Sequence, residues 1–219
     1  MITDSTFADP SQMRSRIRAA LERAASAPGQ DMLWLGDASP EVVEQVRAAL
    51  PKRNVPAAVL VPLVERPGGF TVLLTQRAAT LKDHAGQISF PGGRIEARDP
   101  DAWHAALREA HEEIGLAAAH VEFAGYLPDH LLGTGFRVTP AVGFVDPAFQ
   151  PRIAAEEVHD VFEVPLGYIL DSANHRPRLR RVGELTLPFQ DIPFGDRVIW
   201  GATASMLMAL RRRLLADPA

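Results

Sequence analysis

The 219-residue sequence contains no cysteine. This absence excludes disulfide bonds, thiolate metal sites and a cysteine nucleophile together, and it fits a reducing compartment. The N-terminal segment carries early acids and lacks the apolar core of a signal sequence, so no secretory signal is expected. We therefore expect a cytoplasmic protein.

Two further absences limit the partners. No apolar run approaches the ~18 residues that a membrane-spanning helix requires, so we expect no membrane partner. The formal net charge is -4, which provides no overall positive field, so nucleic acid is not an expected partner. The composition, 47% hydrophobic and 23% charged, is ordinary for a soluble globular protein.

The first part of the chain predicts two short amphipathic helices. Residues 11–26 place apolar side chains at helical spacing, and a second helix follows Pro40 and ends before Pro51. We interpret residues 1–54 as an N-terminal helical extension and residues 55–219 as the main domain. The extension packs either on the core or on a second subunit, so a homodimer is one expectation.

The main domain predicts strands on both sides of a central helix. Two strand-like runs joined by the turn sequence RPGG indicate a hairpin, and a polar loop and a helix ending near Gly115 follow. The further strand-like runs are 121–127, 136–145 and 176–187, before a last helix that reaches about Leu215. This order predicts an α+β fold, with a mixed central sheet sandwiched between helices.

The central helix carries three acids on one face. Glu109, Glu112 and Glu113 stand at i, i+3 and i+4, opposite an apolar stripe. Their mutual repulsion becomes coordination if they bind a hard divalent cation such as Mg²⁺ or Mn²⁺. Taken alone, the helix fits a solvated acidic face equally well.

The residues around this helix resemble a known motif. From Gly93 the sequence reads glycine, five residues, Asp99, eight residues, then REAHEEIGL from Arg108 onward. This is similar to the Nudix box: glycine, five residues, Glu, seven residues, then R-E-U-x-E-E-x-G-U, where U is bulky and apolar. Here Asp99 replaces the early glutamate, the next gap is one residue longer, and Ala110 is small for its position. In the family the early acid supports the arginine; the alternative role for Asp99 is that of a helix N-cap.

The resemblance implies a Nudix fold and a metal-dependent pyrophosphohydrolase. Its metal ligands would be Glu109, Glu112 and Glu113, with a carbonyl of the Gly92–Gly93 loop, for which Gly93 is our candidate. Arg108 would orient a carboxylate or contact phosphate. The general base would be Glu112 or Glu157, although Glu157 fits a plain solvated acid as well.

The segment before the box resembles a second, narrower motif. LLTQRAATLKDHAGQISFPGG, residues 73–93, is similar to the extra motif of Nudix coenzyme A pyrophosphatases: L-L-T-x-R, Ser or Ala, three residues, Arg, three residues, Gly, three residues, then F-P-G-G. Lys82 replaces the second arginine, which keeps the charge but loses the planar fork that grips phosphate at two points. The substrate-binding residues implied here are Arg77, Lys82, Gly86, Phe90 and Arg94.

The implied reaction is hydrolysis of coenzyme A or acyl-coenzyme A to 3′,5′-ADP and (acyl-)4′-phosphopantetheine. Two alternatives stay open from the sequence. One is a Nudix hydrolase acting on ADP-ribose or another nucleoside diphosphate derivative, which the Lys82 substitution leaves open. The other is a non-catalytic Nudix-like ligand sensor, against which the three intact glutamates argue.

Overall fold

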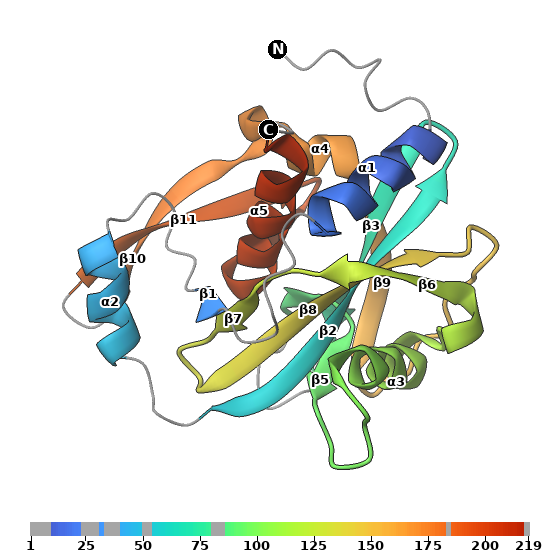
Figure 1. Ribbon diagram of the computed structural model, residues 1–219, viewed down its shortest axis with the longest axis horizontal. Helices are drawn as coiled ribbons and strands as arrows, with labels where there is room; N and C mark the ends of the chain where they lie inside the picture. The colour runs from blue at the N-terminus through green and yellow to red at the C-terminus, as the bar shows by residue number, and fades with distance from the viewer. Residues whose placement is uncertain are drawn as a thin grey trace.

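A computed structural model shows a nine-stranded mixed sheet, a three-stranded antiparallel sheet and helices on both faces of the larger sheet (Figure 1). These features belong to the part of the chain that the structure describes, which comprises residues 10–22, 31–32, 40–49, 54–79, 86–182 and 185–216. The predicted α+β fold with a mixed central sheet is confirmed.

Strand β2 (Val55–Arg66) lies at the centre of the large sheet. It pairs in parallel with β8 (Phe136–Val145) and antiparallel with β3 (Gly69–Arg77), which is joined to β2 by the predicted turn. The outer strands are β1 (Asp31–Met32), β4 (Ile88–Ser89), β5 (Gly92–Arg94), β6 (Val121–Tyr126), β7 (Asp129–Leu131) and β9 (Val158–Pro165).

Alternate side chains of β2 enter two different cores, because successive residues of a strand point to opposite faces. Leu60 belongs to the core beneath α3 (Ala102–Ile114). Val61 belongs to the core on the other face, which is covered by α1 (Pro10–Glu22), α4 (Leu166–Leu170) and α5 (Gly201–Leu215), as Figure 1 shows. The sheet is therefore buried on both sides, and α3, the helix that carries the three acids, covers one of them.

The N-terminal helices differ in what they contact. The four predicted apolar residues of α1 that are described are buried in the main core: Met13, Ile17, Ala20 and Leu21. The second predicted helix, α2 (Pro40–Ala49), packs instead on the smaller sheet, where its Val46 forms a small cluster with Leu187. Among the helices in the described residues, none is long and apolar enough to cross a membrane.

Three regions of the chain differ from the sequence prediction: residues 176–199, residues 78–98 and the strand β9. The run 176–187 is two strands of a hairpin, β10 (Arg176–Val182) and β11 (Leu185–Phe194), followed by β12 (Arg197–Ile199). Alternation alone does not distinguish one long strand from two strands around a short turn. The segment 78–98, predicted as loop, contributes β4 and β5, and β9 was not predicted because charged residues interrupt its apolar pattern.

Candidate metal and pyrophosphate site

Helix α3 begins and ends at residues suited to those positions. The side chain of Asp101 accepts a hydrogen bond from the His104 amide, which makes Asp101 the N-cap. Gly115 ends the helix in the left-handed conformation, with φ of 71°, as the sequence predicts. Ala106 and Ala110 are fully buried against the sheet, so the acids face the edge near β5.

Glu109 lies directly against the backbone of Gly93. A Cβ atom added to Gly93 would be 2.5 Å from the Glu109 Oε1 atom, far closer than atoms of a real side chain approach. The side chain of Glu109 is 16% exposed, and burial raises its pKa against the opposing effect of Arg108. Glycine at this position therefore allows a carboxylate and a backbone to line the same small space.

Glu113 is the most deeply buried acid of the helix. Its residue is 3% exposed, and its Oε2 atom has no hydrogen-bond partner among the described residues. Burial, followed by the nearby charge of Glu109, raises the pKa of Glu113 to about 8, although Arg77 acts in the opposite direction. A buried carboxylate oxygen without a partner is costly, and a hard divalent cation would satisfy it. The residues present therefore fit Mg²⁺ or Mn²⁺.

Arg108 holds the site together. Its Nε and Nη2 atoms donate to the two oxygens of Asp99 at 3.0 and 2.9 Å, in the paired geometry that arginine and carboxylate favour. Its Nη1 atom donates to Glu109 and Glu112, and Nη2 also donates to the carbonyl of Arg94. The hydrogen bonds to Asp99 raise the pKa of Arg108 and lower that of Asp99. Asp99 supports the arginine, and the alternative role as N-cap is wrong because Asp101 has it.

Glu112 is more exposed than the other two acids, although it shares the Arg108 Nη1 atom with Glu109. Its side chain is 48% exposed and accepts from Arg108 at 3.1 Å and from Arg98 at 3.4 Å. Within the described ranges, no three His, Cys, Asp or Glu side chains are gathered as a ready metal cage. The geometry therefore brings Glu109, Glu113 and Gly93 together, while Glu112 pairs with arginines at the rim.

Glu157 lies on a loop that is tied to both ends of the site. The amide of Ala154 donates to the carbonyl of Glu113, and the carbonyl of Glu157 accepts from the amide of Ala78. The charge of Glu157 contributes to the raised pKa values of Glu109 and Glu113, so its carboxylate lies near theirs. Its place near the site fits the base predicted from the sequence.

Three of the five expected substrate-binding residues line one cavity next to the carboxylates. Arg77, Phe90 and Arg94 line a cavity of about 340 Å³ that also borders Gly93. Gly86 lies outside it, in a turn with φ of 70°, where its amide donates to the carbonyl of Arg77. Lys82 lies outside the described residues.

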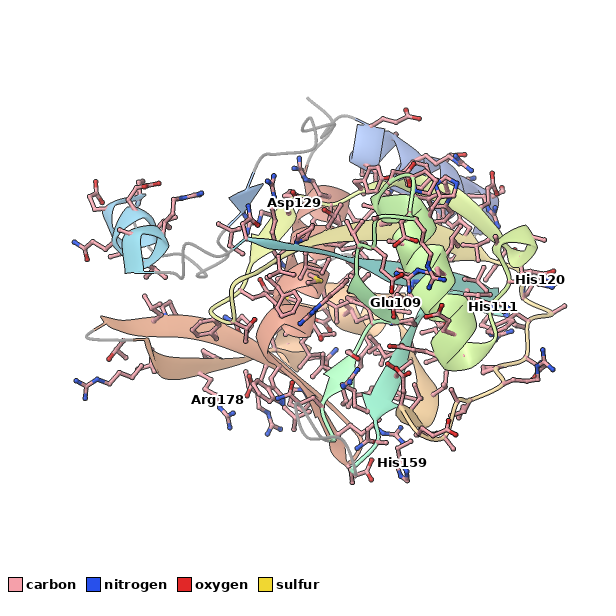
Figure 2. The ribbon with its side chains drawn as sticks, turned by 90° about the horizontal axis from the view of Figure 1, so that it is seen from below. Glu109, His111, His120, Asp129, His159 and Arg178 are labelled. Atoms are coloured by element: carbon pink, nitrogen blue, oxygen red, sulfur yellow. The ribbon has the colours of Figure 1, made fainter. Side chains whose placement is uncertain are left out.

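The cavity also includes residues that the sequence motifs did not indicate. Trp200 and Met206 come from the start of α5, and Leu132 and Phe136 come from the β7–β8 connection. In the sequence these residues look like ordinary core residues. Only the fold brings them to the cavity. Figure 2 shows Glu109 on one side of α3 and His111 on the opposite side, which leaves His111 outside the site.

Comparisons with known proteins agree on one family. The model of the NUDIX domain matches residues 54–183. Two curated proteins named "Uncharacterized Nudix hydrolase NudL", from Salmonella paratyphi B and Salmonella newport, are each 40% identical over 166 residues, covering 74% of this chain and 84% of theirs. A solved Nudix hydrolase from M. smegmatis, RenU, has a similar fold, with a TM-score of 0.52 and 20% identity over 75% of this chain and 88% of that one.

Proposed function

The chain belongs to the Nudix family of hydrolases that act on phosphoric anhydride bonds, and from that premise we propose that its substrate is coenzyme A or acyl-coenzyme A. The products would be 3′,5′-ADP and (acyl-)4′-phosphopantetheine. Nudix hydrolases act on small-molecule pyrophosphates and generally use divalent metal ions such as Mg²⁺ or Mn²⁺.

The observation that carries this proposal is the position of Arg77. It is the arginine of the LLTQR segment, and it ends β3 close enough to Glu113 to oppose the rise of that residue's pKa. Its Nε atom is buried and has no hydrogen-bond partner within the described part of the chain. A cation held in this way beside the carboxylates is available for a phosphate oxygen.

The protein residues would divide the work of hydrolysis between them. Glu109 and Glu113, with the Gly93 carbonyl, would hold the divalent ion, and Mg²⁺ and Mn²⁺ both suit this oxygen-rich set. The ion, when bound, neutralises phosphate charge and lowers the pKa of a coordinated water. Arg108 keeps Glu109 in place, and Arg77 and Arg94 would bind the phosphates.

Glu157 is our proposed general base. Glu112 was the other candidate, and its carboxylate oxygens accept hydrogen bonds from two arginines at the exposed rim. Glu157 has no such ion pair among the described residues. Backbone hydrogen bonds connect its loop to the end of α3 and to the residue after β3. This placement suits removal of a proton from an attacking water.

A substrate panel tests the proposal. The values of kcat/KM would be measured with coenzyme A, dephospho-coenzyme A, ADP-ribose and NADH, each with Mg²⁺ and with Mn²⁺. We expect coenzyme A to have the highest value, and dephospho-coenzyme A to be poorer because it lacks the 3′-phosphate. A higher kcat/KM for ADP-ribose or NADH would assign the site to another pyrophosphate, and no cleavage of any substrate would favour a ligand sensor.

A further inference from the structure

The cavity and the proposed metal site share Gly93 as a common wall. Gly93 forms part of the cavity wall, and the same residue packs against the Glu109 carboxylate on α3. A group bonded to a phosphate that Arg77 and Arg94 bind at this edge has the cavity next to it. Its volume of about 340 Å³ lies at the lower end of the range for small-molecule sites, about 300–1,000 Å³, which fits one arm of a substrate.

The walls of the cavity are largely apolar. The apolar contributors include Val59, Ile88, Phe90, Leu132, Phe136 and Met206. The two hydroxyl groups in the wall already have partners in the protein: Ser89 Oγ lies 3.2 Å from Thr75 Oγ1, and Thr203 Oγ1 donates to the Ile88 carbonyl at 2.9 Å.

The described lining residues include no acid that would accept from the amino group of a base. A nucleobase presents donors and acceptors along its edge, and leaving one buried without a partner costs about 1–3 kcal/mol. The pantetheine chain of coenzyme A also carries two amides and a hydroxyl, but its methyl and methylene groups place apolar surface against these walls along most of its length. The lining therefore favours a chain over a base.

Two arginines supply the positive charge of the cavity. Arg94 is exposed, with its guanidinium carbon 5.5 Å from the centre of the Phe136 ring, and Arg77 ends β3 near Glu113. Positive groups next to an apolar space match a phosphate bound at the edge with an uncharged group extending inward.

We infer that this cavity takes the uncharged chain bonded to one phosphate, which in coenzyme A is the pantetheine arm, and that the nucleoside side lies outside it. The inference rests on the proposed function, since it assigns the two halves of that substrate. It makes residues of α5 and of the β7–β8 connection determinants of specificity.

Filling the cavity tests this assignment. Ala202 lines it from the first turn of α5 and is partly exposed, so Ala202→Phe would occupy its space. Binding of 4′-phosphopantetheine and of 3′,5′-ADP to the full chain would be measured separately by titration calorimetry. We expect the variant to weaken 4′-phosphopantetheine binding at least about tenfold, with 3′,5′-ADP binding changed less than about twofold.

Two further variants control the experiment. Ala119→Phe makes the same change at an exposed position of the short helix 118–120 and should alter neither affinity. Leu132→Trp fills the cavity from a different element, the segment after β7, so the test survives if Ala202→Phe fails to fold by circular dichroism. Both filling variants should weaken the binding of the same product, 4′-phosphopantetheine.

The outcomes separate the inference from the proposed function. If the wild type hydrolyses coenzyme A but the filling variants weaken 3′,5′-ADP binding, or both products equally, the arm does not enter the cavity and the inference is overturned. If the wild type does not hydrolyse coenzyme A, the proposed function fails, and the inference fails with it.

Discussion

Gly93 and Glu109 lie so close that no other residue fits between the glycine backbone and the carboxylate. A Cβ atom on Gly93 would be 2.5 Å from Glu109 Oε1 and 2.7 Å from Oε2. Strand β5 and helix α3 are thus packed together at the point where the carboxylate and the backbone carbonyl would share an ion.

Gly93→Ala should therefore damage the site while leaving most of the fold intact. The methyl group must displace the Glu109 carboxylate, and a displacement of about 1 Å near the chemistry can cost about a hundredfold in rate. We expect kcat/KM to fall by about that factor. Gly167→Ala is the control, because a Cβ there meets no atom within 4 Å, and its activity should match the wild type. Equal activity of both variants would contradict the packing.

The pair formed by Asp99 and Arg108 should contribute to stability as well as to the site. Their side chains are only 5% and 14% exposed, so Asp99→Ala leaves a largely buried guanidinium without its main partner. Breaking such a pair costs about 3–5 kcal/mol when it is fully buried, and we expect about 3 kcal/mol here by urea denaturation. Glu44→Gln breaks an exposed pair and should cost under about 1 kcal/mol. A similar cost for both variants would mean that Asp99 does not anchor Arg108.

Glu113→Gln should separate stability from activity. Because burial raises the pKa of Glu113 to about 8, burying this carboxyl group costs stability at neutral pH, and an amide avoids that cost, so the metal-free variant should be at least as stable as the metal-free wild type. Turnover at saturating metal should nevertheless fall at least about tenfold, because an ion loses one anionic ligand. Thermal unfolding and kinetics on the same preparation give both values. Near-normal turnover would exclude Glu113 as a ligand.

Glu157→Gln should lower kcat without changing metal affinity. General bases contribute about a hundredfold or more to rate, and we expect a loss of at least about tenfold. Glu156→Gln removes the neighbouring exposed acid and should leave kcat unchanged. If Glu156→Gln and Glu157→Gln behave alike, Glu157 is not the base.

His130 should make the protein less stable in mild acid. It is 2% exposed, and burial lowers its pKa, with Arg212 acting in the same direction and Asp129 against it. Below about pH 6.5, His130 binds a proton in the unfolded chain but not in the native protein, because its native pKa is lower. The free energy of unfolding therefore decreases as the pH falls. Nδ1 lies 2.8 Å from the Pro128 carbonyl, so His130→Asn can keep that donor without titrating.

Urea denaturation of both proteins between pH 5 and pH 7 checks this. The wild type should lose more stability than His130→Asn over this interval. Parallel curves for the two proteins would show that another group governs the acid dependence.

The spacing of residues along the chain was enough to predict the acidic helix and its C-terminal end. Glu109 and Glu113 follow from helical periodicity, and Gly115 from its position after the last apolar residue. The sequence left two roles open for Asp99, because an aspartate side chain can either cap a helix or pair with an arginine. Only the structure shows that Asp99 accepts a hydrogen bond from Arg108 and that Asp101 is the N-cap of the helix.

The cavity was beyond sequence reasoning for a different reason. Trp200 and Met206 lie over a hundred residues after Gly93 along the chain and reach it only because α5 packs across the sheet. Strand β9, which begins directly after Glu157, escaped prediction because charged residues interrupt its apolar pattern, and its pairing with β3 favours a strand conformation that its own sequence does not indicate.

The central claim is that the protein hydrolyses coenzyme A, and product analysis by mass spectrometry tests it most directly. Purified full-length protein would be incubated with coenzyme A in Mg²⁺, in Mn²⁺ and in chelator. We predict release of 3′,5′-ADP and 4′-phosphopantetheine with metal and intact coenzyme A with chelator. Intact coenzyme A in all three conditions, from a preparation that cleaves ADP-ribose or NADH, would contradict the claim.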